Sequence, residues 1–184
     1  MKLLLIAAIG LFVVADVHAQ DGNTGDGAAL VRAMRADEMI LEFSKSALLQ
    51  ARSEGHITSA QYDCFQKLPA SAFTADLGKF LVSQFSRDEI IEALAFYRSP
   101  TGVKVVDSVF VILANAAAIT ITVKPTNADA MSVDDMKAAR EFSETGVGQQ
   151  LVVNNLVMKS PESREIARRI VGKRLIACGA KVSR

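Results

Sequence analysis

Hydrophobic residues recur at intervals of three and four along most of the chain, which predicts a series of amphipathic α-helices. A long helix is expected over about 28–54, with Gly55 as its C-terminal stop. A capping box at Thr58 and Gln61 begins a shorter helix, and Ser160 begins the last one. We therefore expect an all-α fold, a single-domain array of about six to eight helices.

The segment that begins at Ser86 resembles the segment that begins at Ser132, which sets a repeat offset of 46 residues. In each copy an acidic residue follows three positions after the serine, as in a capping box. Copies over 85–124 and 131–159 predict a duplicated helical hairpin. Because acidic residues in a first turn complement the helix dipole, we assign both carboxylate pairs to capping rather than to acid–base catalysis or metal binding. These pairs are Asp88 with Glu89 and Asp134 with Asp135.

Hydrophobic positions of the two copies also correspond. Phe85 and Ile90 flank the first capping box and predict a hydrophobic staple, which Met131 and Met136 are expected to repeat. We expect a shared core stripe on the first helix of each copy, with the second copy more exposed. Further aligned pairs are Ala93 with Ala139, Phe96 with Phe142, Gly102 with Gly148 and Val106 with Val152.

The N-terminus has the order of a secretory signal peptide. A positive charge precedes the apolar run 3–14, and the small residue Ala19 follows it. This run is shorter than the roughly 20 residues of a membrane span, although an uncleaved signal anchor remains the alternative. We expect residues 1–19 to be removed by cleavage after Ala19, leaving a periplasmic chain without a transmembrane span. A flexible linker is expected over 20–27 and one helical domain over 28–184.

Two cysteines, Cys64 and Cys178, remain in the expected mature chain. An even number of cysteines in an oxidising compartment predicts a disulfide, and two cysteines allow one pairing. The alternative is a reactive thiol at Cys64 assisted by His56, which precedes it by eight residues. We favour the structural disulfide.

The composition and charge of the chain exclude or disfavour several classes of protein. The chain has 184 residues, of which 50% are hydrophobic and 22% charged, with a formal net charge of +1. These values exclude a disordered charged tail and disfavour a nucleic-acid-binding protein. The sequence carries no phosphate-binding glycine loop, zinc-ligand cluster or nucleophile elbow. We therefore expect no cofactor, no metal and no enzymatic activity.

The last helix carries several cations on one side. They are candidates for contact with an acidic partner or with anionic lipid head groups, and a solvated helix face is the alternative. The candidate residues are Arg164, Arg168, Arg169 and Lys173.

A short motif near the middle of the chain resembles the signature of a bacterial exported family, domain of unknown function 2059. Its residues are Phe96, Tyr97, Ser99, Pro100, Gly102 and Lys104. The resemblance is strong over roughly 71–110 and implies an all-helical fold, but it carries no catalytic or ligand-binding residues. The second copy departs from the motif, with Ser143 in place of Tyr97 and Gly146 in place of Pro100.

These observations lead to two hypotheses of function. The first is a non-catalytic periplasmic module that binds a protein or an envelope component through its helix surfaces. The alternative is a small carrier in which the apolar segment 103–123 lines a cavity for a hydrophobic or lipid-like ligand. Assembly of the chain into a homo-oligomer is compatible with either hypothesis.

Overall fold

The computed structural model describes residues 16–116 and 131–180, and all regular structure within these ranges is helical. The predicted all-α fold is confirmed, and this part of the chain forms ten α-helices and one short π-helix. Residues 1–15 of the expected signal peptide, and the first repeat copy beyond residue 116, lie outside the described ranges. The elements are α1 (Asp16–Ala33), α2 (Ala36–Ser53), α3 (Ser59–Phe65), α4 (Ser71–Gln84), α5 (Arg87–Tyr97), α6 (Pro100–Ala116), α7 (Val133–Glu144), α8 (Gly146–Gly148), η1 (Gln149–Val153), α9 (Leu156–Lys159) and α10 (Pro161–Ala177).

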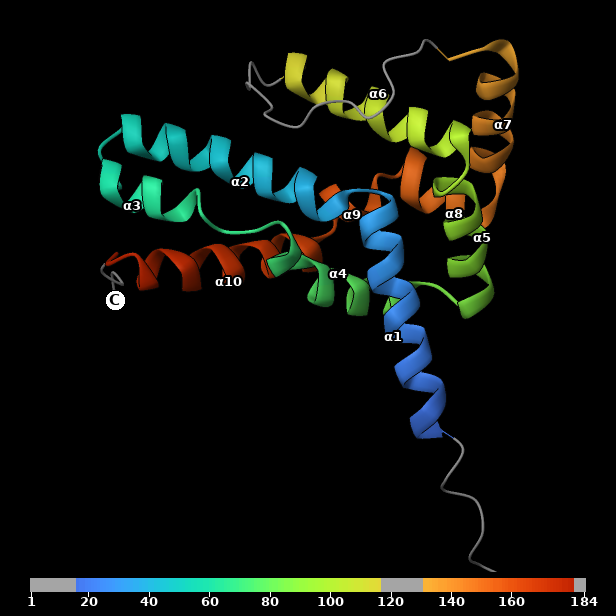
Figure 1. The fold of residues 1–184 in the computed structure, drawn as a ribbon, viewed down its shortest axis with the longest axis horizontal. Coiled ribbons are helices and arrows are strands. Elements are labelled where there is room, and N and C mark those ends of the chain that lie inside the picture. Colours follow the sequence, from blue (N-terminus) through green and yellow to red (C-terminus); the bar gives the residue numbers. More distant parts are fainter. Residues whose placement is uncertain (1–15, 117–130, 181–184) are drawn as a thin grey trace, which may run out of the picture.

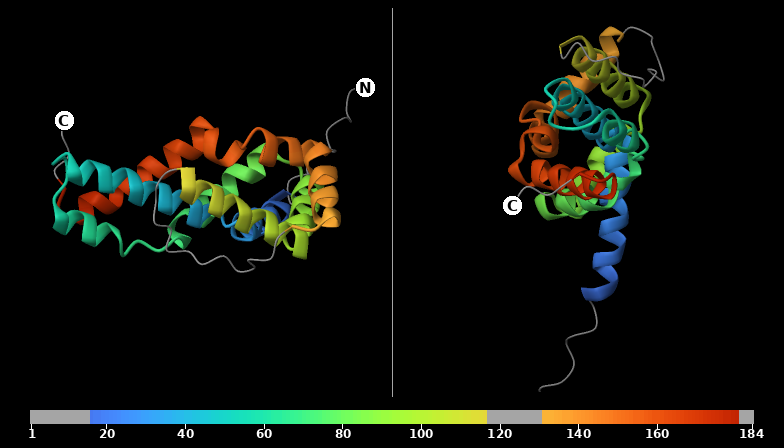
Figure 2. Two further views of the ribbon diagram at one scale, coloured as in Figure 1. Left: turned by 90° about the horizontal axis from the view of Figure 1, so that it is seen from above. Right: turned by 90° about the vertical axis from the view of Figure 1, so that its left-hand side faces the viewer.

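The helices form an elongated array (Figures 1 and 2). At one end, α3 packs against both α2 and α10, and at the other end α5, α7 and α8 lie together. Helix α4 connects the two ends because it packs against α2 and α10 on one side and against α5 on the other. The N-terminal half of α1 projects from the body of the molecule (Figure 1).

One hydrophobic core runs through the array. Its largest fully buried apolar side chains come from α1, α3, α4, α5 and α8, so the two ends share a continuous interior. These side chains include Leu30, Val31, Phe65, Phe73, Leu77, Leu81, Ile90 and Val147.

The long helix predicted over 28–54 is broken in the structure at Arg35. This residue adopts a left-handed conformation, with φ 52° and ψ 32°, and separates α1 from α2. Its guanidinium binds Glu38 at 2.7 Å and Asp107 of α6 at 2.9 Å, and it lies 4.4 Å from the ring centroid of Phe110. These tertiary contacts, absent from any local pattern, favour a backbone conformation that is unusual for a non-glycine residue.

The flexible linker expected over 20–27 is a wrong prediction, because these residues belong to α1. At the end of this segment Gly27 forms a close helix crossing. A Cβ atom added there would lie 2.4 Å from the backbone oxygen of Gly78 in α4. Glycine thus lets the two backbones approach, and the residue type that suggested flexibility permits tight packing.

The two repeat copies pack crosswise. Helix α5 of the first copy packs against α8 of the second, and α7 of the second copy packs against α6 of the first. All three predicted capping boxes, at Thr58, Ser86 and Ser132, are present. The core stripe of the second copy is only partly realised, because Met136 is 54% exposed whereas its counterpart Ile90 is fully buried. Both predicted staple residues are therefore buried in the first copy alone.

Candidate functional site

The motif residues of the first copy build a tight corner between α5 and α6. Ser99 Oγ accepts a hydrogen bond from the Gly102 amide at 3.0 Å. The second copy reproduces this contact, with Thr145 Oγ1 accepting from the Gly148 amide at 3.1 Å. The two corners occupy aligned positions, so the duplication seen in the sequence is also a duplication of local geometry. Pro100 begins α6, where its missing amide hydrogen costs nothing.

Aromatic side chains join the two copies at this corner. The ring of Phe96 stacks on that of Phe142 with centroids 3.9 Å apart and an interplanar angle of 7°. Tyr97 meets Phe142 edge-on at 5.5 Å. Phe96 and Phe142 are the aligned phenylalanines of the repeat, so equivalent residues form the contact between copies. We infer that these two motif aromatics hold the hairpins together.

The last motif residue, Lys104, reaches across to the second copy. Its ammonium donates to Asp135 Oδ2 at 2.8 Å, and Thr101 Oγ1 donates to Asp135 Oδ1 at 2.7 Å. Asp135 also accepts from the Ser132 backbone amide at 2.9 Å as part of its capping box. The Lys104 ammonium, and then these hydrogen bonds, hold the pKa of the Asp135 carboxyl well below its ordinary value. This carboxylate is thus both a helix cap and an ion-pair partner.

The depressed pKa of Asp135 predicts a pH dependence of stability. A carboxyl whose pKa is lower when folded contributes fully above its unfolded pKa of about 3.9, and this contribution is lost as the pH falls toward the folded pKa. We expect Asp135→Asn to lower the urea midpoint at pH 7 and to differ less from the unsubstituted chain at pH 2, where part of the carboxylate's contribution has been lost. The matched control Asp134→Asn, at an exposed neighbouring position, should have a smaller effect. An equal loss at both pH values for Asp135→Asn would contradict this account.

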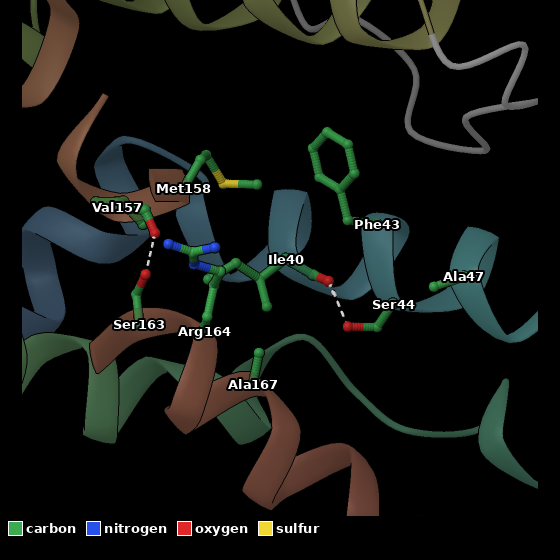
Figure 3. A pocket seen from close by; sticks show the side chains of 9 residues that line it. All are labelled: Ile40, Phe43, Ser44, Ala47, Val157, Met158, Ser163, Arg164 and Ala167. Atoms are coloured by element: carbon green, nitrogen blue, oxygen red, sulfur yellow. Dashed lines mark hydrogen bonds between the residues drawn. The ribbon is translucent and has the colours of Figure 1, made fainter. Parts of the chain in front are cut away.

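An open apolar groove lies between α2 on one side and α9 and α10 on the other (Figure 3). Its volume is about 400 Å³. The lining is largely hydrophobic, and the side chain of Phe43 projects from α2 between Ile40 and Ala47 in Figure 3. Half-buried Phe43 and Met158 leave apolar surface accessible here. The lining residues are Ile40, Phe43, Ser44, Ala47, Val157, Met158, Ser163, Arg164 and Ala167.

Arg164 supplies the cationic group of the groove. Its Nη2 donates to the backbone oxygen of Lys159 at 2.9 Å, and its Nε donates to that of Ser160 at 3.4 Å. Within the described ranges this guanidinium makes no ion pair with a carboxylate. Two carbonyls therefore fix a positive charge beside an apolar surface.

The other three cations of the predicted basic face differ in the ion pairs that they form. Arg169 binds Asp76 of α4 at 2.7 Å, and Arg168 lies 3.6 Å from Glu165 on its own helix. Lys173 is exposed and forms no ion pair with another described residue. The four cations thus do not form one uniform surface, and Arg164 is the member that lines the groove.

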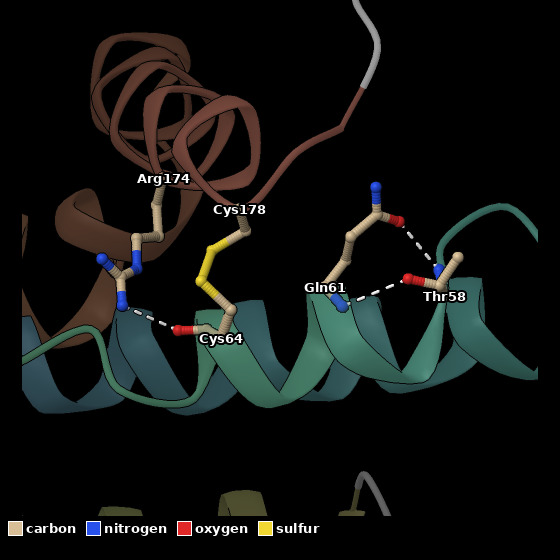
Figure 4. Close-up of a disulfide and its surroundings, with 5 residues drawn as sticks. All are labelled: Thr58, Gln61, Cys64, Arg174 and Cys178. Atoms are coloured by element: carbon tan, nitrogen blue, oxygen red, sulfur yellow. Dashed lines mark hydrogen bonds between the residues drawn. A yellow bond between two sulfur atoms is a disulfide. The ribbon is translucent and has the colours of Figure 1, made fainter.

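Cys64 at the end of α3 and Cys178 after α10 form a disulfide, as the sequence predicted (Figure 4). Arg174 supports the same junction by donating from Nη2 to the backbone oxygen of Cys64 at 2.8 Å. His56 instead lies 3.3 Å from Glu54 and is well exposed. With its sulfur in a disulfide, Cys64 offers no thiol for the alternative Cys–His pair.

Residues 16–116 and 131–180 contain neither a metal-binding cluster nor a membrane-spanning helix. Among the residues that the structure describes, no three His, Cys, Asp or Glu side chains gather closely enough to hold a metal ion. Over the same ranges, none of the helices combines the length and hydrophobicity that a membrane crossing requires.

Sequence reasoning missed the groove. Its two walls come from segments more than 100 residues apart, and each wall taken alone is an ordinary amphipathic helix. The available signal was Phe43, a large aromatic residue on the helix predicted over 28–54. That signal indicates accessible apolar surface, but it does not indicate which helix lies opposite.

Comparison with known proteins gave one match. Residues 71–123 match the family described as "Uncharacterized protein conserved in bacteria (DUF2059)". This region contains α4, α5 and α6 and therefore the whole motif corner. No curated protein and no solved structure matched the chain.

Proposed function

We propose that this protein, which belongs to the DUF2059 family through residues 71–123, is an exported, non-catalytic helical module that binds a partner protein. The observation that carries the proposal is the open groove between α2, α9 and α10 with Arg164 fixed in its lining. The motif corner, by contrast, is used internally to join the two repeat copies.

The shape and lining of the groove favour a peptide segment as its occupant. A volume of about 400 Å³ falls within the range of natural binding sites, and both walls are helices. An amphipathic helix placed along such a groove would bury residues at i, i+3 or i+4, and i+7. The exposed Ala47 on α2 and the half-buried Ala167 on α10 leave space between the walls for these side chains.

The charge of the groove favours an acidic partner. Arg164 is already oriented by two backbone carbonyls, so little side-chain entropy is lost when a carboxylate binds it. A partner segment that carries one Asp or Glu beside its apolar stripe would satisfy both features. We therefore propose an acidic amphipathic segment of an envelope protein as the ligand.

The disulfide supports the exported location. Disulfides persist in oxidising compartments, and this one joins two segments of the expected mature chain. Cleavage after Ala19 would remove only the part of α1 that precedes Gln20, well before the buried Leu30. The mature chain would therefore retain its core.

The second candidate function is a carrier of a hydrophobic ligand. It is favoured by one observation, a cavity lined by Val105, Val106 and Val109 of the apolar segment that suggested this role. At about 120 Å³ this cavity suits a small molecule and is well below the size of drug-sized ligand sites. A lipid-like cargo is therefore disfavoured.

Filling the groove tests the proposed function. We expect a displayed library of amphipathic peptides to yield binders that carry acidic residues. Ala47→Trp should weaken the binding of these peptides about tenfold or more, because the indole would occupy the groove. The matched control is Ala75→Trp, an exposed mid-helix alanine of α4 outside the groove lining, which should leave affinity unchanged. Arg164→Gln should weaken acidic peptides and not their amide counterparts. Binders that respond equally to both tryptophan variants would overturn the groove as the site.

A further inference from the structure

A second cavity shares Val157 and Met158 of α9 with the groove but opens toward α6 and η1. Its wall combines methionines from the α1–α2 junction, Met34 and Met39, with valines of α6. Methionine side chains adapt to irregular shapes, so this wall can adjust around different small ligands. The volume of about 120 Å³ approaches that of an engineered protein cavity, about 150 Å³, that binds benzene.

Two polar side chains line this otherwise apolar space. Tyr97 is only 5% exposed, and its hydroxyl forms no hydrogen bond with any residue in the described ranges. Asn155, which is half-buried and held in a left-handed conformation with φ 51°, likewise leaves its side-chain amide without a described partner. Neither polar group belongs to the fully buried atoms without a partner among the described residues, so both keep accessible surface that a ligand in the cavity can reach.

Burial also fixes the chemical character of the Tyr97 hydroxyl. Desolvation raises the pKa of Tyr97 well above its ordinary value, so the group stays protonated and able to donate throughout the physiological range. An incoming hydrogen-bond acceptor would therefore meet a donor in an environment of low polarity. In such an environment a hydrogen bond is electrostatically stronger than in water.

The cavity has access to solvent. Val109 of α6 and Val152 of η1 both line it, and they are 38% and 40% exposed. Two partly exposed apolar side chains from different elements mark an entrance where a nonpolar molecule can be desolvated in steps.

We propose that this cavity binds one small ligand, a ring or short chain that carries a single carbonyl-type oxygen, with the Tyr97 hydroxyl donating to that oxygen. Asn155 offers a second donor or acceptor near the same ligand. The proposal deepens the carrier function by naming its ligand class and does not depend on peptide binding in the groove. It also gives Tyr97 a role in ligand binding beyond its contact with Phe142.

Two probes of matched shape test the proposal. Cyclopentanone carries the acceptor oxygen, and methylenecyclopentane replaces it with carbon. Binding is followed by the methyl resonances of Met34, Met39 and Val106, and intermolecular Overhauser contacts to these methyl groups locate the probe in the unsubstituted chain. We expect cyclopentanone to bind about fivefold more tightly, the effect of one net hydrogen bond.

Substitution of the hydroxyl isolates its contribution. Tyr97→Phe keeps the ring and should abolish the preference for cyclopentanone, whereas the matched control Tyr62→Phe, at a buried tyrosine outside the cavity lining, should retain it. A preference that survives Tyr97→Phe overturns the proposal. The absence of Overhauser contacts for either probe, with water alone in the cavity, also overturns it. The groove is tested separately through Ala47→Trp, so the two proposals fail independently.

Discussion

Loss of the disulfide between Cys64 and Cys178 is expected to lower the free energy of unfolding by about 2–5 kcal/mol. The cysteines are 114 residues apart, so the bond closes most of the described chain into one loop. Closing a loop of this size restricts the unfolded state strongly, although measured gains often fall below the entropy estimate. The bond also holds the end of α10 against α3, next to the hydrogen bond from Arg174.

Urea unfolding of the Cys64→Ala/Cys178→Ala variant measures this effect. The reductant dithiothreitol provides the matched control, since it should destabilise the unsubstituted chain and leave the double variant unchanged. Thiol titration establishes that reduction is complete. If the fully reduced protein unfolds at the same urea concentration as the oxidised one, the disulfide contributes nothing to stability and the prediction is wrong.

Alanine substitution at either repeat-corner glycine is expected to destabilise the fold by about 1–3 kcal/mol, the usual cost of overpacking. A Cβ atom at Gly102 would lie 2.1 Å from the backbone oxygen of Phe96. The equivalent atom at Gly148 would overlap the backbone oxygen of Phe142 even more closely. Backbone has to move in both cases, because neither contact is with a flexible side chain.

Gly172 provides the matched control for these two substitutions. It lies within α10, and a Cβ atom added there meets nothing within 4 Å. Gly172→Ala should therefore stabilise the protein by about 0.5–1 kcal/mol, since alanine has the higher helix propensity. Thermal unfolding of all three variants separates the two effects. If Gly102→Ala raised the melting temperature as Gly172→Ala does, the tight corner would not exist in solution.

The equivalence of the two corners explains why the repeat is recognisable at particular positions. The glycines and hydroxyl side chains recur because the same corner geometry requires them in both copies, and the aligned phenylalanines stack on each other between the copies. Positions without such a requirement have diverged. Tyr97 and Ser143 are an example, since only the tyrosine lines the α6 cavity.

The sequence by itself determined the helical class, the three capping boxes, the repeat offset and the cysteine pairing. Helix starts were predictable because a capping box depends on residues within four positions of one another, as at Ser86 and Glu89. The pairing of Cys64 with Cys178 followed from their number alone. These features require no knowledge of which helices meet.

Tertiary structure alone decided the features that depend on distant partners. The helix break at Arg35 is accompanied by contacts with Asp107 and Phe110, which lie more than 70 residues away. Residues 20–27 are helical although their composition is typical of a linker, and the close crossing of Gly27 with Gly78 depends on a helix distant in sequence. The groove and the Tyr97 cavity arise where separate segments fail to fill the space between them, and packing of this kind has no local sequence pattern.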